Sequence, residues 1–123
     1  MRGEQVPFNE REIQKLVIAE LKVYKVLKIQ LANLEERERA GMSDLFPTIR
    51  ESDGKTNLKV MQIARALEES LDSLEKELIE KKYLSSSDPT DLEVYLDLGI
   101  KKAKYYAKKK EALNCIATAL GII

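Results

Sequence analysis

Residues 90–106 read TDLEVYLDLGIKKAKYY, and this stretch decides how the C-terminal third of the chain folds. Thr90 and Glu93 have the T-x-x-E spacing of a capping box, in which two side chains satisfy the free backbone N–H groups at a helix start. A short helix is therefore predicted from about Asp91 to Leu98.

The residues after this short helix are suited to a steep crossing between two helices. Gly99 tolerates the positive φ that a tight turn needs, Ile100 can fill the corner, and Ala103 is small enough for a close approach. A last helix is predicted from about Lys101 to Leu120. A short helix, a turn containing Gly and a longer helix form the helix-turn-helix layout.

The last helix carries six lysines between positions 101 and 110, in a chain whose formal net charge is zero. In a helix-turn-helix protein the N-terminal part of the second helix enters the major groove, where lysines neutralise phosphates and a tyrosine can reach a phosphate or a base edge. Apolar spacing predicts a core side made of Ala103, Tyr106, Leu113, Ile116, Ala117 and Leu120. The predicted DNA-binding residues are Lys101, Lys102, Lys104, Tyr105, Lys108 and Lys109. Tyr106 is thus expected to face the core and Tyr105 the DNA.

A solvated or protein-binding face is the competing interpretation of these lysines. Lysines at a helix start oppose the helix macrodipole, so helix stability does not explain Lys101 and Lys102. Acidic residues just upstream could pair with some of the lysines and lower the local potential: Asp88, Asp91, Glu93 and Asp97. The pattern alone leaves both interpretations open.

A long helix is predicted at the other end of the chain, with Asn9 as its N-cap and Gly41 just past its end. Apolar residues recur along it at three- and four-residue steps: Ile13, Leu16, Val17, Leu21, Tyr24, Leu27, Leu31 and Leu34. Val23, Val26 and Ile29 widen the apolar face. We therefore expect neighbours on two sides, from the same chain or from a second subunit.

A connection is predicted over residues 42–57, which contain Pro47 and an Asp–Gly pair. A second long helix should begin near Asn57 or Leu58, because Ala64, Leu67, Leu71, Leu74 and Leu78 follow the heptad spacing of a coiled-coil seam. Folded back on the first helix it makes an antiparallel hairpin, although the same seam could serve a homodimer. The sequence predicts an all-α fold, with a long antiparallel helical hairpin over residues 1–84 followed by a helix-turn-helix module over residues 85–123.

Composition argues against catalysis. The chain has 123 residues, which suits one domain, and it contains no His, so a Cys–His catalytic pair and a Cys/His zinc site are excluded. The single cysteine, Cys115, lies in an apolar run and is predicted to be a buried structural thiol in a reducing compartment. No Gly-rich phosphate loop or metal-ligand spacing occurs, so neither an enzyme nor a cofactor is expected. No signal peptide is recognisable, and no stretch reaches the ~20 apolar residues of a membrane span. The expected location is the cytoplasm.

The stretch YLSSSDPTDLEVYLDLGIKKAKYYAKKKEALNCIATALGII, residues 83–123, resembles the C-terminal signature of the ArpU/RinA-type phage transcriptional regulators. The positions that carry the resemblance are Tyr83, Leu84, Asp91, Tyr95, Leu98, Gly99, Ile100, Tyr105, Tyr106, Lys109, Lys110, Ala112, Leu113, Ala117, Leu120, Gly121 and Ile122. Two positions depart from the pattern: Lys101 stands where a small polar residue is usual, and Ala107 where a basic residue often follows the tyrosine pair.

This resemblance implies a helix-turn-helix similar to region 4 of sigma factors. It further implies a phage or prophage regulator that binds double-stranded DNA and activates late genes, such as those for packaging and lysis, in the cytoplasm of a bacterial host. Host RNA polymerase would be a second partner, and the N-terminal helices would dimerise or contact the polymerase. Two alternatives stay open: a coiled-coil adaptor or dimerisation protein that does not bind DNA, and a DNA-binding protein similar to a phage small terminase subunit.

Overall fold

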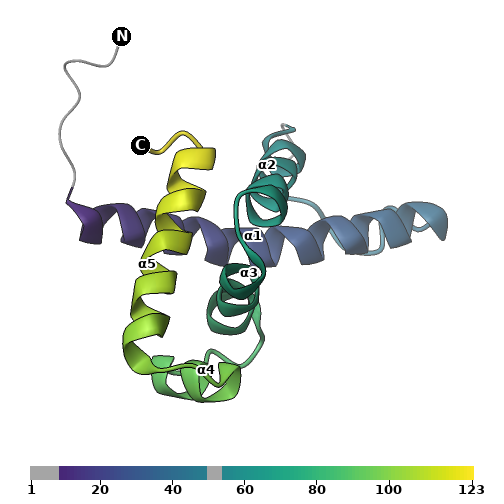
Figure 1. The fold of residues 1–123 in the computed structure, drawn as a ribbon. Coiled ribbons are helices and arrows are strands. Elements are labelled where there is room, and N and C mark those ends of the chain that lie inside the picture. The colour runs from purple at the N-terminus through teal and green to yellow at the C-terminus, as the bar shows by residue number, and fades with distance from the viewer. Residues whose placement is uncertain (1–8, 50–53) are drawn as a thin grey trace, which may run out of the picture.

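The structure, a computed structural model, describes residues 9–49 and 54–123 and is all helical within them. Its α-helices there are α1 Glu10–Arg39, α2 Lys55–Glu69, α3 Ser73–Ile79, α4 Asp91–Leu98 and α5 Lys102–Ala119. Figure 1 shows α1 as a long rod, with α5 crossing it and α4 lying away from it at the N-terminal end of α5. The predicted all-α class is confirmed. Residues 1–8 and 50–53, which include the N-terminal segment and part of the predicted connection, lie outside the described residues.

The ends of α1 follow the predicted capping residues. Asn9 Oδ1 accepts a hydrogen bond of 2.8 Å from the backbone N–H of Glu12 and so starts the helix. At the other end Gly41 has a φ of 70°, and the N–H of Met42 donates to the carbonyl of Arg37 over 2.8 Å. Both bonds satisfy backbone groups that a helix end leaves without an intrahelical partner.

The bounds predicted for α4 are confirmed. Thr90 and Glu93 form the expected capping box, with the Thr90 N–H donating to Glu93 Oε1 over 2.9 Å. Gly99 ends the helix in the left-handed conformation, with a φ of 70°. A Cβ at this position would meet no atom within 4 Å, so the requirement for glycine is conformational and not steric.

The prediction of one second long helix is wrong, because the helix ends at Glu69 and a separate helix begins at Ser73. Asp72 caps α3: its Oδ1 accepts from the N–H of Glu75 over 2.8 Å, while Glu75 Oε1 accepts from the N–H of Asp72 over 2.9 Å. Leucines on both sides of the break keep the heptad spacing, which is why the segment resembled one helix. The D-x-x-E spacing of Asp72 and Glu75 was the contrary signal.

A π-helical turn, Glu80–Leu84, continues α3 and leads toward α4. Ser85, the residue after the turn, is held by one hydrogen bond to α1 and one to the turn itself. Lys25 Nζ of α1 donates to the carbonyl of Ser85 over 2.6 Å, and Ser85 Oγ donates to the carbonyl of Lys81 over 2.8 Å. These bonds hold the end of the turn beside α1, and from there the chain leads to α4.

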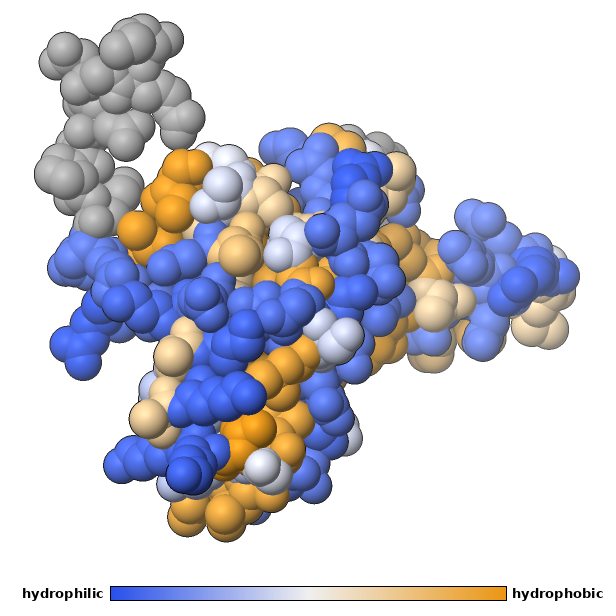
Figure 2. All heavy atoms as spheres, in the orientation of Figure 1, coloured by the Kyte–Doolittle hydropathy of each residue, from blue (hydrophilic) through white to orange (hydrophobic). Residues whose placement is uncertain are grey.

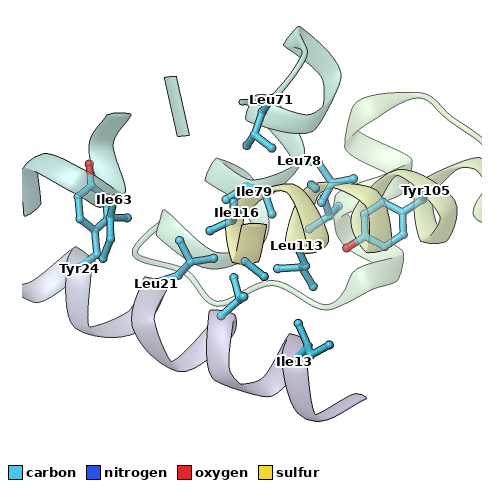
Figure 3. Packing of buried hydrophobic residues seen from close by; sticks show 14 residues of the cluster. Ile13, Leu21, Tyr24, Ile63, Leu71, Leu78, Ile79, Tyr105, Leu113 and Ile116 are labelled. Carbon is cyan, nitrogen blue, oxygen red and sulfur yellow. The ribbon is translucent and has the colours of Figure 1, made fainter. Parts of the chain in front are cut away.

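One hydrophobic core joins the two predicted segments (Figure 3). Leu21 of α1 and Ile116 of α5 are fully buried within it. Its buried members are Ile13, Val17, Leu21, Tyr24, Ile63, Leu71, Leu78, Ile79, Val94, Tyr105, Ala112, Leu113, Ile116 and Ala117. The ranges 1–84 and 85–123 thus do not have separate cores. Cys115 is half-buried beside it, and burial raises the pKa of its thiol, which disfavours the reactive thiolate.

The second half of α1 extends beyond this core. All buried residues of α1 lie between Ile13 and Tyr24, and none of residues 25–39 is buried within the described chain. Figure 1 shows this half projecting past α2. None of the described helices is both long and apolar enough to cross a membrane.

Candidate nucleic-acid interface

The turn between α4 and α5 presents the start of α5 to solvent. The N–H of Gly99 donates to the carbonyl of Leu96 and that of Ile100 to the carbonyl of Tyr95, each over 3.2 Å, which closes α4. α5 then begins after Lys101, whose side chain makes no capping hydrogen bond. The first turn of a helix has backbone N–H groups without intrahelical acceptors and carries partial positive charge. The opening of α5 is therefore electropositive even before its side chains are counted.

Three predicted site residues, Lys101, Lys102 and Lys104, lie together at this opening. All three side chains are exposed, and none forms an ion pair or hydrogen bond with any other side chain in residues 9–49 and 54–123. Ala103 was predicted to face the core but is exposed among them, as is Ala107 one turn later. The small alanines leave the lysines as the protruding groups on this surface.

The orientation predicted for the two tyrosines is wrong: Tyr105 is fully buried, whereas Tyr106 is 42% exposed. Tyr105 lies 5.6 Å, ring centre to ring centre, from Tyr95 of α4, and its hydroxyl donates to Asp91 Oδ1 over 2.5 Å. Near its start α5 packs against α4 and α3, whereas Figure 3 shows its later residues over α1. Tyr105 lies seven residues before the fully buried Ala112 and so shares its face, and Tyr106 takes the exposed place assigned to its neighbour.

Lys109, another predicted site residue, is engaged within the protein. Its Nζ lies 3.0 Å from Asp91 Oδ1 and 5.9 Å from the ring centre of Tyr105. Burial alone would raise the pKa of Asp91, but the hydrogen bonds from Tyr105 and Lys109 outweigh it and hold that pKa below its usual value. Burial and the bond to Asp91 raise the pKa of Tyr105. Asp91, predicted as a possible partner of the lysines, thus holds the start of α4 against α5.

Lys108 of α5 is also paired, with acidic residues at the start of α3. Its Nζ lies 2.6 Å from Asp72 Oδ2 and 3.7 Å from Glu75 Oε2, the two residues of the α3 capping box. The hydrogen bond from Lys108 lowers the pKa of Asp72, and the same interaction raises the pKa of Lys108. Lys110 pairs with Glu10 of α1 at 3.1 Å. The lysine run therefore divides into an exposed group at the start of α5 and a paired group that ties α5 to its neighbours.

An apolar surface lies on α4, the helix that precedes the exposed lysines. Leu92 is 53% exposed and Leu96, one turn later on the same face, is 66% exposed. Figure 2 shows hydrophobic spheres at the end of the molecule where α4 lies, near hydrophilic spheres along α5. This surface was not predicted from the sequence, although the i, i+4 spacing of the two leucines was a signal for it.

The described residues show no cluster of three or more His, Cys, Asp or Glu side chains that could hold a metal ion. Comparison of the chain with protein-family models, with curated proteins and with solved structures finds no match in any of the three.

Proposed function

We propose that the chain binds double-stranded DNA, with the first turns of α5 in or against the major groove. The observation that carries this proposal is the group formed by Lys101, Lys102 and Lys104, which is exposed and unpaired in the described residues. Three ammonium groups beside a helix N-terminus repel one another and oppose the macrodipole, so the arrangement costs stability. A polyanion would relieve that cost by neutralising the charges.

The neighbouring residues support the same surface. Tyr106 is 42% exposed one turn after Lys102. Its hydroxyl donates to Asp91 Oδ2 over 3.4 Å, and exchange of this long bond for a phosphate or base edge would bring it into the DNA contact. Ala103 and Ala107 are small and exposed, which allows the helix axis to approach a groove. The DNA-contacting set proposed is therefore Lys101, Lys102, Lys104 and Tyr106, whereas Lys108, Lys109 and Tyr105 stabilise the fold that presents them.

The biological role proposed is transcriptional regulation of phage or prophage late genes, with host RNA polymerase as a second partner. This role rests on the resemblance of residues 83–123 to the ArpU/RinA-type regulators. A small-terminase-like role would use the same DNA-binding surface. The two are separated by where the protein binds during infection: regulator binding concentrates at a promoter upstream of packaging or lysis genes, and terminase binding at packaging start sites.

The test of DNA binding is the salt dependence of affinity for a duplex, measured by fluorescence anisotropy with the full chain. Each phosphate neutralised releases counterions, so affinity should fall steeply as salt rises. Changing Lys101, Lys102 and Lys104 to Ala should lower the log–log salt slope by about one for each phosphate that the variant leaves without a lysine. Circular dichroism checks that the variant stays folded.

A matched triple variant provides the control. Lys15→Ala, Lys28→Ala and Lys59→Ala remove the same charge from exposed positions on α1 and α2, and should leave the salt slope nearly unchanged. Equal weakening by the two triple variants would show that binding follows total charge and not this surface. Absence of duplex affinity at low salt would contradict DNA binding altogether.

Leu92 and Leu96 favour a second candidate function, in which the α4–α5 surface binds an acidic protein and the chain acts as an adaptor. Exposed leucines beside lysines suit a protein partner better than a phosphate backbone. Changing both leucines to Ser should leave duplex affinity unchanged, because the proposed DNA contacts are made by the lysines of α5 and not by these leucines. Loss of a protein partner without loss of duplex affinity would assign the two activities to different sides of the α4–α5 pair.

A further inference from the structure

From Lys22 onward, a stretch that includes its projecting half, α1 carries apolar side chains that the described residues leave exposed. Val23 is 43% exposed, Val26 63% and Ile29 57%. No residue in positions 25–39 is buried in the described chain, although helices of this kind owe most of their stability to packing of an apolar face. Figure 2 shows hydrophobic spheres among the hydrophilic ones where α1 extends past α2. Within residues 9–49 and 54–123, nothing packs over this surface to bury it.

Charged residues of opposite sign lie at equal distances from the middle of this surface. Lys22, Val26, Ile29 and Glu36 share one stripe of the helix, because they follow steps of four, three and seven residues. Lys22 precedes Ile29 by seven residues and Glu36 follows it by seven, which places each charge about 10 Å along the axis from Ile29. Both charged side chains are exposed and make no ion pair within the described residues.

We infer that this surface binds a second copy of the chain, with the two α1 helices antiparallel and the two-fold axis beside Ile29. In that register Lys22 of each copy lies level with Glu36 of the other, and Ile29 packs against its own symmetry mate. A parallel pairing would put Lys22 beside Lys22 and Glu36 beside Glu36, which like-charge repulsion disfavours. The charge pattern is therefore complementary to a second copy of itself, and it favours the antiparallel direction.

A residue of the connecting segment extends the same surface. Phe46 is 62% exposed and its ring lies 5.5 Å from the guanidinium carbon of Arg37, which places it beside the last turns of α1. In the antiparallel register Arg37 lies level with residue 21 of the other copy, within one turn of that copy's Val23. Phe46 and Val23 can then pack together at each end of the interface.

The test measures the oligomeric state of the full chain by sedimentation velocity across a concentration series, without DNA, so it does not depend on the proposed function. The wild-type chain should show a monomer–dimer equilibrium. Ile29→Asp should weaken the dimer more than about tenfold, because the change places two carboxylates at the two-fold axis. Leu96→Asp, at an equally exposed apolar site on α4, is the matched control and should leave the equilibrium unchanged.

A charge exchange tests the register itself. Lys22→Glu and Glu36→Lys should each weaken the dimer, because each places like charges level with one another at both ends of the interface. The double variant should recover wild-type affinity by restoring both pairs in reversed order. A double variant weakened by the sum of the two single effects would overturn the antiparallel register. A wild-type chain that stays monomeric throughout the series, or a dimer that Ile29→Asp does not affect, would overturn the inference as a whole.

Discussion

Tyr105 and Tyr106 show how far spacing alone can place a single side chain. Counting back from Leu113 by seven residues reaches Tyr106, so a straight apolar stripe predicts that Tyr106 is buried. Counting back by seven from Ala112, which is also fully buried, reaches Tyr105 instead, so spacing places the two tyrosines equally close to the core face and does not choose between them. Asp91 accepts a hydrogen bond from the hydroxyl of Tyr105, and its position beside that ring depends on tertiary contacts that residue spacing does not encode.

Truncation should separate the roles of the two tyrosines. Tyr105→Ala removes a fully buried ring and leaves Asp91 without the hydrogen bond from its hydroxyl, so we expect a loss of about 3–5 kcal/mol in the free energy of unfolding. Tyr106→Ala removes a ring that is 42% exposed and should cost about 1 kcal/mol or less. Urea denaturation followed by circular dichroism measures both, and equal losses would contradict the burial of one ring and the exposure of the other.

At the scale of elements, capping residues predicted the helix ends well, because a cap is a local interaction between residues three positions apart. Asn9, Thr90 and Gly99 all lie at the ends where their side chains or conformational freedom predict them. The break before Ser73 was missed because the leucine spacing continues across it. A capping box inside an apolar repeat is therefore a stronger signal of a helix start than the repeat is of one continuous helix.

The start of α5 leads to a prediction about stability and binding together. Lys101 occupies the N-cap with an extended backbone, φ −76° and ψ 153°, and makes no side-chain cap. Lys101→Ser should add about 1 kcal/mol to the free energy of unfolding, because Ser can accept a hydrogen bond from the first turn. The same change should weaken duplex binding by removing a phosphate contact. A variant that is neither more stable nor weaker in binding would remove Lys101 from the proposed site.

At the scale of the whole molecule, the two predicted ranges, residues 1–84 and 85–123, share one core. The predicted boundary at residue 84 stands just before SSSDPT, residues 85–90, a polar stretch typical of a break between helices. The structure instead packs the later half of α5 on the first half of α1, an arrangement of distant parts of the chain that local pattern does not reveal.

A fragment containing residues 85–123 should therefore fail to fold alone. It would expose Leu113 and Ile116, both fully buried in the whole chain, together with their partners on the same face. The full chain should unfold in one cooperative step, since both ranges share the same core. Circular dichroism of the fragment and coincident denaturation curves from two spectroscopic probes check these points, and a helical, cooperatively melting fragment would contradict them.

The π-helical turn at Glu80–Leu84 makes chain length a determinant of how the chain reaches α4. A turn closed by i→i+5 bonds holds one residue more than an α-helical turn with the same hydrogen-bonding role. Deleting one residue there would restore α-helical phase and rotate the remaining residues of the turn by about 100° about the helix axis. The Ser85 carbonyl would then move away from Lys25 Nζ, which donates to it over 2.6 Å. Substitutions in this segment keep the phase of the turn, whereas insertions and deletions do not.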